Sequence, residues 1–141
     1  MSLLPRKGLL AIAAVIDVAV HTRERPMSAQ TLAARHNLPP RHLEPVLQAL
    51  VRAGIFSGVR GPRGGYQLSR ERRRISVNDI LRAAGTVEEA ADADMPSSRI
   101  IDDIVLPAIT DAERTFAAAL SRLTVEELAR RAEAAGERGS R

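Results

Sequence analysis

The chain has 141 residues, enough for one ordinary domain or a small domain with an appendage. Hydrophobic residues make up 45% of it and aromatic residues only 2%, so its core must be built from aliphatic side chains. Because it contains no cysteine, disulfides, thiolate metal sites and cysteine-ligated iron–sulfur clusters are excluded.

The net charge of +4 is unevenly divided along the chain. Residues 1–85 contain fourteen Lys or Arg and five Asp or Glu, a charge of +9, whereas residues 86–141 contain seven and twelve, a charge of −5. A basic front segment favours a polyanionic partner, and the phosphates of nucleic acid are the first to consider.

Residues 6–22 are predicted to form a helix that is apolar on nearly all sides, which places it at the centre of the fold. Its apolar run at 8–20 is shorter than the roughly 20 residues of a membrane span, and Asp17 interrupts it. The run follows two basic residues, as in a signal peptide, but no clear small-residue cleavage site comes after it. A buried helix and a cytoplasmic location are therefore expected.

Two shorter helices are predicted next. Ser28 is a suitable N-cap for a helix at 29–36. A tight connection leads to a second helix that begins at residue 40 or 41, carries one apolar stripe and continues to about residue 53. Gly54 is placed to end this helix.

The stretch GVRGPRGGYQLS at 58–69 predicts a β-hairpin with strands at 55–59 and 66–68. Its glycines fit neither a P-loop nor a dinucleotide-binding pattern. The tip would carry Arg60 and Arg63 outward. A hairpin directly after two helices joined by a tight turn predicts a winged helix-turn-helix, whose second helix enters the major groove of DNA while the wing contacts the backbone or the minor groove.

Further helices are predicted beyond the hairpin. A helix at 77–84 is capped by Ser76. A long helical stripe begins at Ser98, and Pro107 should kink or split it. Thr124 opens a last helix, which continues to about residue 135.

The long stripe has no partner surface in the compact front domain, so the same helix of a second chain is the economical partner. The candidate dimerisation residues are Ile101, Ile104, Val105, Ala108, Ala112, Phe116, Ala119 and Leu123. The predicted organisation is a winged helix-turn-helix domain at 1–85, an acidic connector at 86–97, a helical dimerisation region at 98–135 and a disordered tail at 136–141. The predicted fold class is mainly α with a small β-hairpin.

Several stretches resemble one known family. They are Lys7-Gly8 with IDVAV at 16–20, LAARHNL at 32–38, HLEPVLQALVRAGI at 42–55, VRGPRGGYQLS at 59–69 and ISVNDILRAA at 75–84. On these stretches the chain resembles the Rrf family of bacterial winged-helix transcription regulators, which includes IscR, NsrR, RirA and CymR. The resemblance covers about residues 5–85, and the ending TVEELA at 124–129 is also similar.

The resemblance implies a homodimer that binds double-stranded DNA at a palindromic operator. The base-reading residues would be Pro40, Arg41, His42 and Glu44 at the start of the second paired helix. The wing would contribute Arg60, at the position that enters the minor groove, with Gly61, Pro62, Arg63 and Gly64 around it. The phosphate-binding residues would be Arg6, Lys7, Ser28, Gln30 and Arg63. Arg41 can donate a bidentate pair to guanine, and Glu44 can accept from a cytosine amine.

The chain departs from the family pattern in two respects. The family's sensory residues are commonly three cysteines in the segment equivalent to 86–100, which hold an iron–sulfur cluster. This chain has none, so no cluster ligand carries over and no cofactor is expected. His42 stands where tyrosine is usual and Pro39-Pro40 where small polar residues are usual, so its operator is expected to differ.

Other polar residues could suggest different chemistry. The candidate metal ligands are His21, His36, His42, Asp92, Asp94, Asp102 and Asp103. The histidines lack an i, i+4 pairing, so structural roles are favoured for the first two, and the aspartates suit a solvated connector and a helix N-terminus better than a cation site. The run ERRR at 71–74 is open between a phosphate-binding run and a solvated loop. No nucleophile–base pair is visible, so the chain is not expected to be an enzyme.

The sequence therefore predicts a dimeric winged helix-turn-helix transcription regulator, with repression as the expected sign of control. Three alternatives stay open for its input: a small molecule bound between the wing domain and the long helix, a protein effector, or no ligand. The competing interpretation is a winged-helix scaffold for protein interaction. Arg60 distinguishes the two, because only a DNA reader should lose affinity on Arg60→Ala.

Overall fold

The computed structural model describes residues 4–21, 25–85 and 97–136, and it confirms a mainly helical fold with one β-hairpin. The α-helices are α1 (Arg6–His21), α2 (Ala29–Arg35), α3 (Pro40–Arg52), α4 (Val77–Ala84), α5 (Leu106–Arg122) and α6 (Val125–Ala134). The strands are β1 (Phe56–Val59) and β2 (Gly65–Leu68). Each predicted helix and strand is present, and its bounds agree with the prediction to within one or two residues. The end of the expected tail, 137–141, and most of the expected connector, 86–96, lie outside the described residues.

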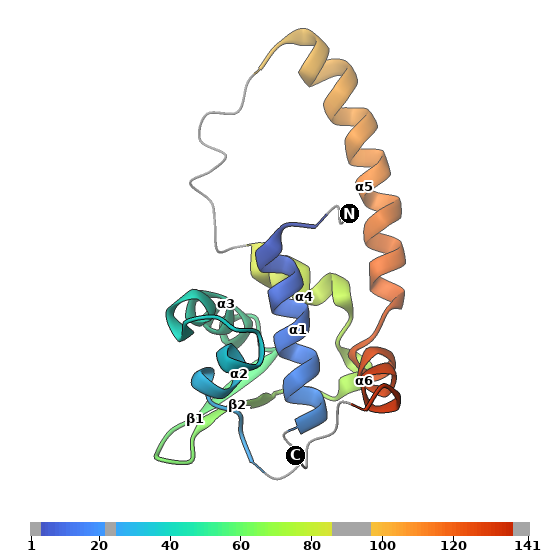
Figure 1. Ribbon diagram of the computed structural model, residues 1–141. Helices are drawn as coiled ribbons and strands as arrows, with labels where there is room; N and C mark the ends of the chain where they lie inside the picture. Colours follow the sequence, from blue (N-terminus) through green and yellow to red (C-terminus); the bar gives the residue numbers. More distant parts are fainter. Residues whose placement is uncertain (1–3, 22–24, 86–96, 137–141) are drawn as a thin grey trace.

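Helix α1 is the centre of the body, as its all-round apolar pattern predicted. It packs against α3, α4, α6 and β2, and Figure 1 shows it running between the helix-turn-helix and α6. Gly8 permits its close approach to α4, because a Cβ atom at this position would lie 2.9 Å from Cδ2 of Leu81. Within the described part of the chain, no helix is both long and apolar enough to cross a membrane.

The hairpin is extended by a residue that the sequence analysis missed. Strands β1 and β2 pair antiparallel, with Phe56 opposite Leu68 and Val59 opposite Gly65. Met27, just before α2, adds a single bridge to β2: its N–H donates to the Tyr66 carbonyl at 3.0 Å, and the Tyr66 N–H donates back at 2.7 Å. One bridging residue has no alternating pattern, so the sequence carried no signal for it. The bridge fixes the hairpin to the start of the helix-turn-helix.

The long helix is wound continuously through Pro107. It begins after Ser98, whose Oγ accepts a hydrogen bond from the Ile101 N–H at 3.2 Å. A π-helical turn, η4 (Ile101–Val105), comes first and leads directly into α5. Proline has no N–H to donate, and the wide turn just before it accommodates this loss. Of the two expected outcomes at Pro107, a kink or a split, the structure shows no split.

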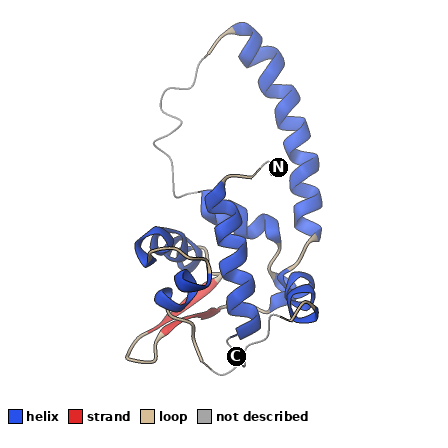
Figure 2. Ribbon diagram, viewed as in Figure 1, coloured by secondary structure: helices blue, strands red, loops and turns tan. Residues whose placement is uncertain are grey.

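Helix α6 returns to the body after α5 has left it. Figure 2 shows α5 extending well beyond the other helices, and although α5 packs against α4, no residue of η4 or α5 is buried. By contrast, Val125 and Ala129 of α6 are fully buried in the core around α1. The predicted dimerisation region at 98–135 thus contains two unlike parts: an exposed helix and a helix that completes the front body.

Candidate nucleic-acid interface

Helix α3 presents a polar face to solvent. Pro40 occupies its first turn, where a missing N–H costs nothing. The buried side is formed by Leu43, Val46, Leu47, Ala49 and Leu50. The opposite side exposes Arg41, His42 and Glu44 among its residues. The base-reading positions predicted from the family resemblance are therefore accessible, with Pro40 half-buried beside them.

The wing exposes its two arginines at the tip. Arg60, Gly61, Pro62 and Arg63 are all exposed, and the Gly64 N–H closes the tip by donating to the Gly61 carbonyl at 2.9 Å. The turn depends on glycine at its far end. Gly65 has φ +153°, and a Cβ atom there would lie 2.3 Å from the Met27 carbonyl oxygen. Any side chain at Gly65 would therefore push the wing off the bridge to Met27.

A polar contact and an aromatic contact join the wing to α3. The Gln48 side chain donates to the Tyr66 hydroxyl at 3.3 Å, and the rings of Tyr66 and Phe56 lie 5.9 Å apart. In Figure 1, α2, α3 and the hairpin occupy one side of α1, opposite α5 and α6. The wing and α3 thus lie on the same side of α1 and are in contact through Gln48, an exposed residue of α3.

The arginines of this surface are available to a ligand. Arg41, Arg60 and Arg63 are exposed, and none of them pairs with a carboxylate among the described residues. Exposed guanidinium groups without internal partners are what phosphate and base-edge recognition requires.

The remaining predicted contacts are less uniform. Gln30 is exposed on α2, but the Ser28 hydroxyl is occupied: it caps α2 by accepting from the Thr31 N–H at 3.1 Å. Arg6 is exposed at the start of α1, whereas the Lys7 ammonium is buried. Burial of this nitrogen counts against the predicted contact of Lys7 with phosphate.

The helix-turn-helix is anchored by a buried carboxylate that sequence reasoning missed. Asp17 of α1 is 8% exposed. Its two oxygens lie 3.0 Å from Nε of Arg35 and 2.7 Å from Nε2 of His36, at the end of α2. Nδ1 of His21 lies 2.9 Å from the Asp17 carbonyl oxygen. His36 therefore joins α2 to α1, and His21 closes the last turn of α1, in agreement with the structural roles favoured for them.

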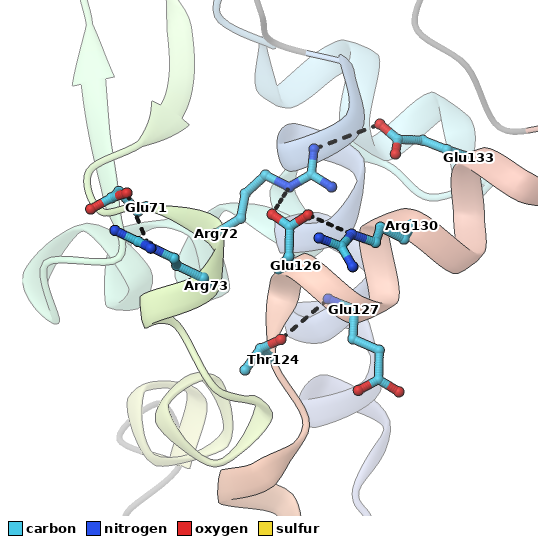
Figure 3. Close-up of polar contacts among 8 residues, drawn as sticks. All are labelled: Glu71, Arg72, Arg73, Thr124, Glu126, Glu127, Arg130 and Glu133. Carbon is cyan, nitrogen blue, oxygen red and sulfur yellow. Dashed lines mark hydrogen bonds and ion pairs between the residues drawn. The ribbon is translucent and has the colours of Figure 1, made fainter.

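The arginine run at 71–74 divides between two environments (Figure 3). Arg73 and Arg74 are exposed and pair locally with Glu71, at 3.2 Å and 3.3 Å. Arg72 lies in the 3-10 turn η1 (Arg72–Arg74) and points instead toward two glutamates of α6. The two alternatives left open for this run, a phosphate-binding run and a solvated loop, both omitted a structural contact of this kind.

Known proteins with similar sequences and structures are transcription regulators. The sequence profile of the family described as "Rrf2: Iron-dependent Transcriptional regulator" matches residues 4–131. The HTH-type transcriptional regulator IscR of Xenorhabdus nematophila is 38% identical over 90 residues, which cover 64% of this chain and 53% of that protein. IscR of Vibrio cholerae is 34% identical over the same length, 50% of that protein. The matched segment thus spans about half the length of these curated relatives.

Solved structures match over more of the chain. The structure of T. potens IscR superposes with a TM-score of 0.72 and 30% identity, covering 94% of this chain and 90% of that one. CymR, the global cysteine regulator of B. subtilis, superposes with a TM-score of 0.66 and 28% identity, covering 92% and 97%. The likeness therefore includes the long helix as well as the helix-turn-helix and wing.

Proposed function

The chain belongs to the Rrf2 family of transcriptional regulators, and from this membership we propose that it binds operator DNA through α3 and the wing. The observation that carries the proposal is that α3 and the wing lie in contact on one side of α1, and that each exposes arginines without internal partners. A major-groove helix beside a wing is the arrangement by which winged helices bind duplex DNA.

Each part of this surface suits a different part of DNA. Arg41 is placed to donate to guanine, and Glu44 to accept from cytosine, in the major groove. Arg60 at the wing tip suits a narrow minor groove. Arg63 and Gln30, both exposed, suit the flanking phosphates. His42 faces solvent beside Arg41 and completes the proposed reading face.

We further propose that the protein is a homodimer and that α5 forms its interface. The exposed large hydrophobic residues of the long helix include Ile104, at 64% exposure, and Ile109, at 51%. A helix that leaves its own body with apolar residues exposed along its length is best covered by a second copy. Two-fold symmetry would place two α3 helices on the half-sites of a palindromic operator.

The chain lacks the residues that would hold an iron–sulfur cluster, although the family description names iron. An iron–sulfur cluster is held by thiolates, and the sequence contains no cysteine. Over residues 4–21, 25–85 and 97–136, no three His, Asp or Glu side chains come together as a metal-binding group. The proposed DNA binding therefore relies on the side chains of α3, α2 and the wing, with no metal ion in the interface. The effector of the protein could be a small molecule or another protein. We propose that the protein acts in the cytoplasm as a repressor of transcription.

Fluorescence anisotropy with labelled DNA from the upstream region of the gene tests the proposal. We expect selective binding over unrelated DNA, with affinity that falls steeply as salt rises. Arg41→Ala and Arg60→Ala should each weaken selective binding by about tenfold or more. Arg114→Ala is the matched control, because this arginine is also exposed but lies on α5.

A scaffold without specific DNA binding would give the opposite pattern. Its affinity would be weak, the same for every duplex and insensitive to Arg41→Ala. In that case the exposed face of α3 would be tested next by pull-down with the same variants.

A further inference from the structure

The segment between the wing and α4, residues 69–76, is attached to helices on both sides of the body. Nε of Arg70 donates to the carbonyl of Gly54, two residues after the end of α3, at 3.3 Å. Two residues later, the side chain of Arg72 reaches in the other direction, toward α6. The segment therefore connects the end of the reading helix to the last helix of the chain.

Arg72 is held between two carboxylates of α6 (Figure 3). Its Nε lies 3.2 Å from Oε1 of Glu126, and its Nη1 lies 3.6 Å from Oε2 of Glu133. The Nε–Glu126 contact is an ion pair rather than an aligned hydrogen bond. Only 19% of the Arg72 side chain is exposed, against 67% for Arg73. Glu126 is oriented in turn by Arg130 at 2.8 Å.

A backbone pairing continues the same connection. The Val125 N–H donates to the Ile75 carbonyl at 2.8 Å, and the Val77 N–H donates to the Leu123 carbonyl at 2.8 Å. Between them Ser76, the N-cap of α4, lies opposite Thr124, the N-cap of α6. Leu123 is the residue on which the long helix ends. The end of α5 is thus hydrogen-bonded directly to the segment that follows the wing.

We propose that Arg72 is a positioning residue for DNA binding: with Glu126 and Glu133 it holds the wing and the C-terminal end of α5 in one fixed orientation. If the orientation is fixed in this way, the dimerisation helix determines where each wing meets DNA. This consequence rests on the proposed function. Apart from this connection, α5 packs against α4, which begins directly after the same segment, so both attachments of α5 run through the residues that follow the wing.

The first test measures orientation without DNA. Because the chain has no cysteine, Gln67→Cys on β2 and Arg114→Cys on α5 can carry two spin labels in an otherwise unlabelled protein. Electron–electron double resonance, with labelled chains diluted by unlabelled protein, reports the distance between wing and long helix in one chain. We expect a narrow distribution in the parent and in Arg73→Met, and a broader one in Arg72→Met and Glu126→Gln. Equal distributions in all four proteins would overturn the proposal.

The second test separates positioning from direct phosphate contact. Arg72→Met and Glu126→Gln should each weaken operator binding by about tenfold, and the double variant should be no worse than either alone. The salt slope should stay unchanged, because no phosphate contact is lost. If Arg72 bound phosphate directly, Arg72→Met would lower the salt slope by about one and Glu126→Gln would strengthen binding, which would overturn the proposal.

Two controls, thermal melting and Arg73→Met, keep the outcomes distinct. Thermal melting identifies any variant that is unfolded at the working temperature, and Glu126→Gln, which keeps the arginine, provides the second variant in that event. Arg73→Met removes a charge from the same run without touching α6 and should leave binding within about twofold of the parent. If the parent binds no operator selectively, the proposed function fails, whereas the distance measurement still decides the role of Arg72.

Discussion

Asp17 and His36 join the central helix to the turn of the helix-turn-helix, with Oδ2 of the aspartate 2.7 Å from Nε2 of the histidine. Asp17 is the one charged residue among the described residues that is buried, and its other oxygen pairs with Arg35. The pair fixes where α2 ends relative to α1. Since α3 begins four residues after His36, the same contact sets the direction in which the reading helix leaves the body.

Replacing this carboxylate should destabilise the fold. Asp17→Asn keeps the shape but removes the charge that faces Arg35 and His36, and the expected loss is about 2 kcal/mol in the free energy of unfolding. Urea denaturation followed by circular dichroism measures it. Asp111→Asn, at a side chain 77% exposed, is the matched control and should change stability by less than about 0.5 kcal/mol. Equal effects of the two variants would show that the buried cluster contributes nothing special.

The wing should tolerate alanine at one glycine and not at another. Gly65→Ala places a Cβ atom against the Met27 carbonyl and demands an unfavourable φ, so we expect a loss of about 1–3 kcal/mol in stability. Gly58→Ala, on β1, meets no atom within 4 Å and should be nearly neutral. Chemical denaturation compares them, and a stable Gly65→Ala with unaltered operator affinity would contradict the importance given to the bridge at Met27.

Charge on the apolar face of α5 should separate the dimer. Ile109→Glu would bury a carboxylate in the proposed interface, an unfavourable transfer unless the charge is paired. Sedimentation equilibrium should then give the mass of one chain instead of two, and operator affinity should fall with it. Arg114→Glu changes charge on the opposite face of the helix and should leave the dimer intact. A dimer that persists in Ile109→Glu would mean that the interface lies elsewhere.

The capping box at the start of α4 should contribute measurably to the stability of the fold. The Ser76 hydroxyl accepts from the Asp79 N–H at 3.0 Å, and the Asp79 carboxylate accepts from the Ser76 N–H at 3.0 Å. Ser76→Ala should cost about 1 kcal/mol of stability. Ser121→Ala, whose exposed hydroxyl bonds only to the preceding turn of α5, should cost less than about 0.5 kcal/mol. Thermal unfolding of both variants measures the difference.

Operator binding should not respond to iron. The anisotropy titration is repeated on protein treated with a chelator and on protein supplied with ferrous iron and sulfide under anaerobic conditions. We expect the same affinity within about twofold in both, since the chain contains no thiolate to hold a cluster. An iron-dependent change in affinity, accompanied by a visible absorption band, would contradict the absence of a cluster.

Local chemistry made most of the fold predictable. Ser28, Ser76 and Thr124 cap helices where their sequence context indicated, and Gly54 ends α3 with φ +78°. The glycine-rich stretch at 58–69 forms the hairpin because only glycine suits its turn. Each of these signals is contained within a few neighbouring residues, which is why the sequence alone sufficed.

The contacts that the sequence did not reveal are those between distant segments. His36 meets a carboxylate 19 residues earlier in the chain, and Arg72 meets glutamates of α6 more than fifty residues later. Lys7 was a predicted phosphate contact, but its ammonium group is buried. The apolar pattern of α1 did not indicate that this side chain would be covered. Charge pairing across a tertiary interface leaves no periodicity, so only the three-dimensional arrangement identifies these partners.

The return of α6 to the body has a consequence for the order of synthesis. Val125 and Ala129 complete the core around α1, yet they emerge from the ribosome only after the whole of α5. The exposed apolar helix is therefore already available to a second nascent chain while the first body still lacks its last helix. Chains translated side by side from one message would thus be expected to pair before either body is finished, and a fragment ending at residue 85 would fold poorly even though it contains every predicted DNA contact.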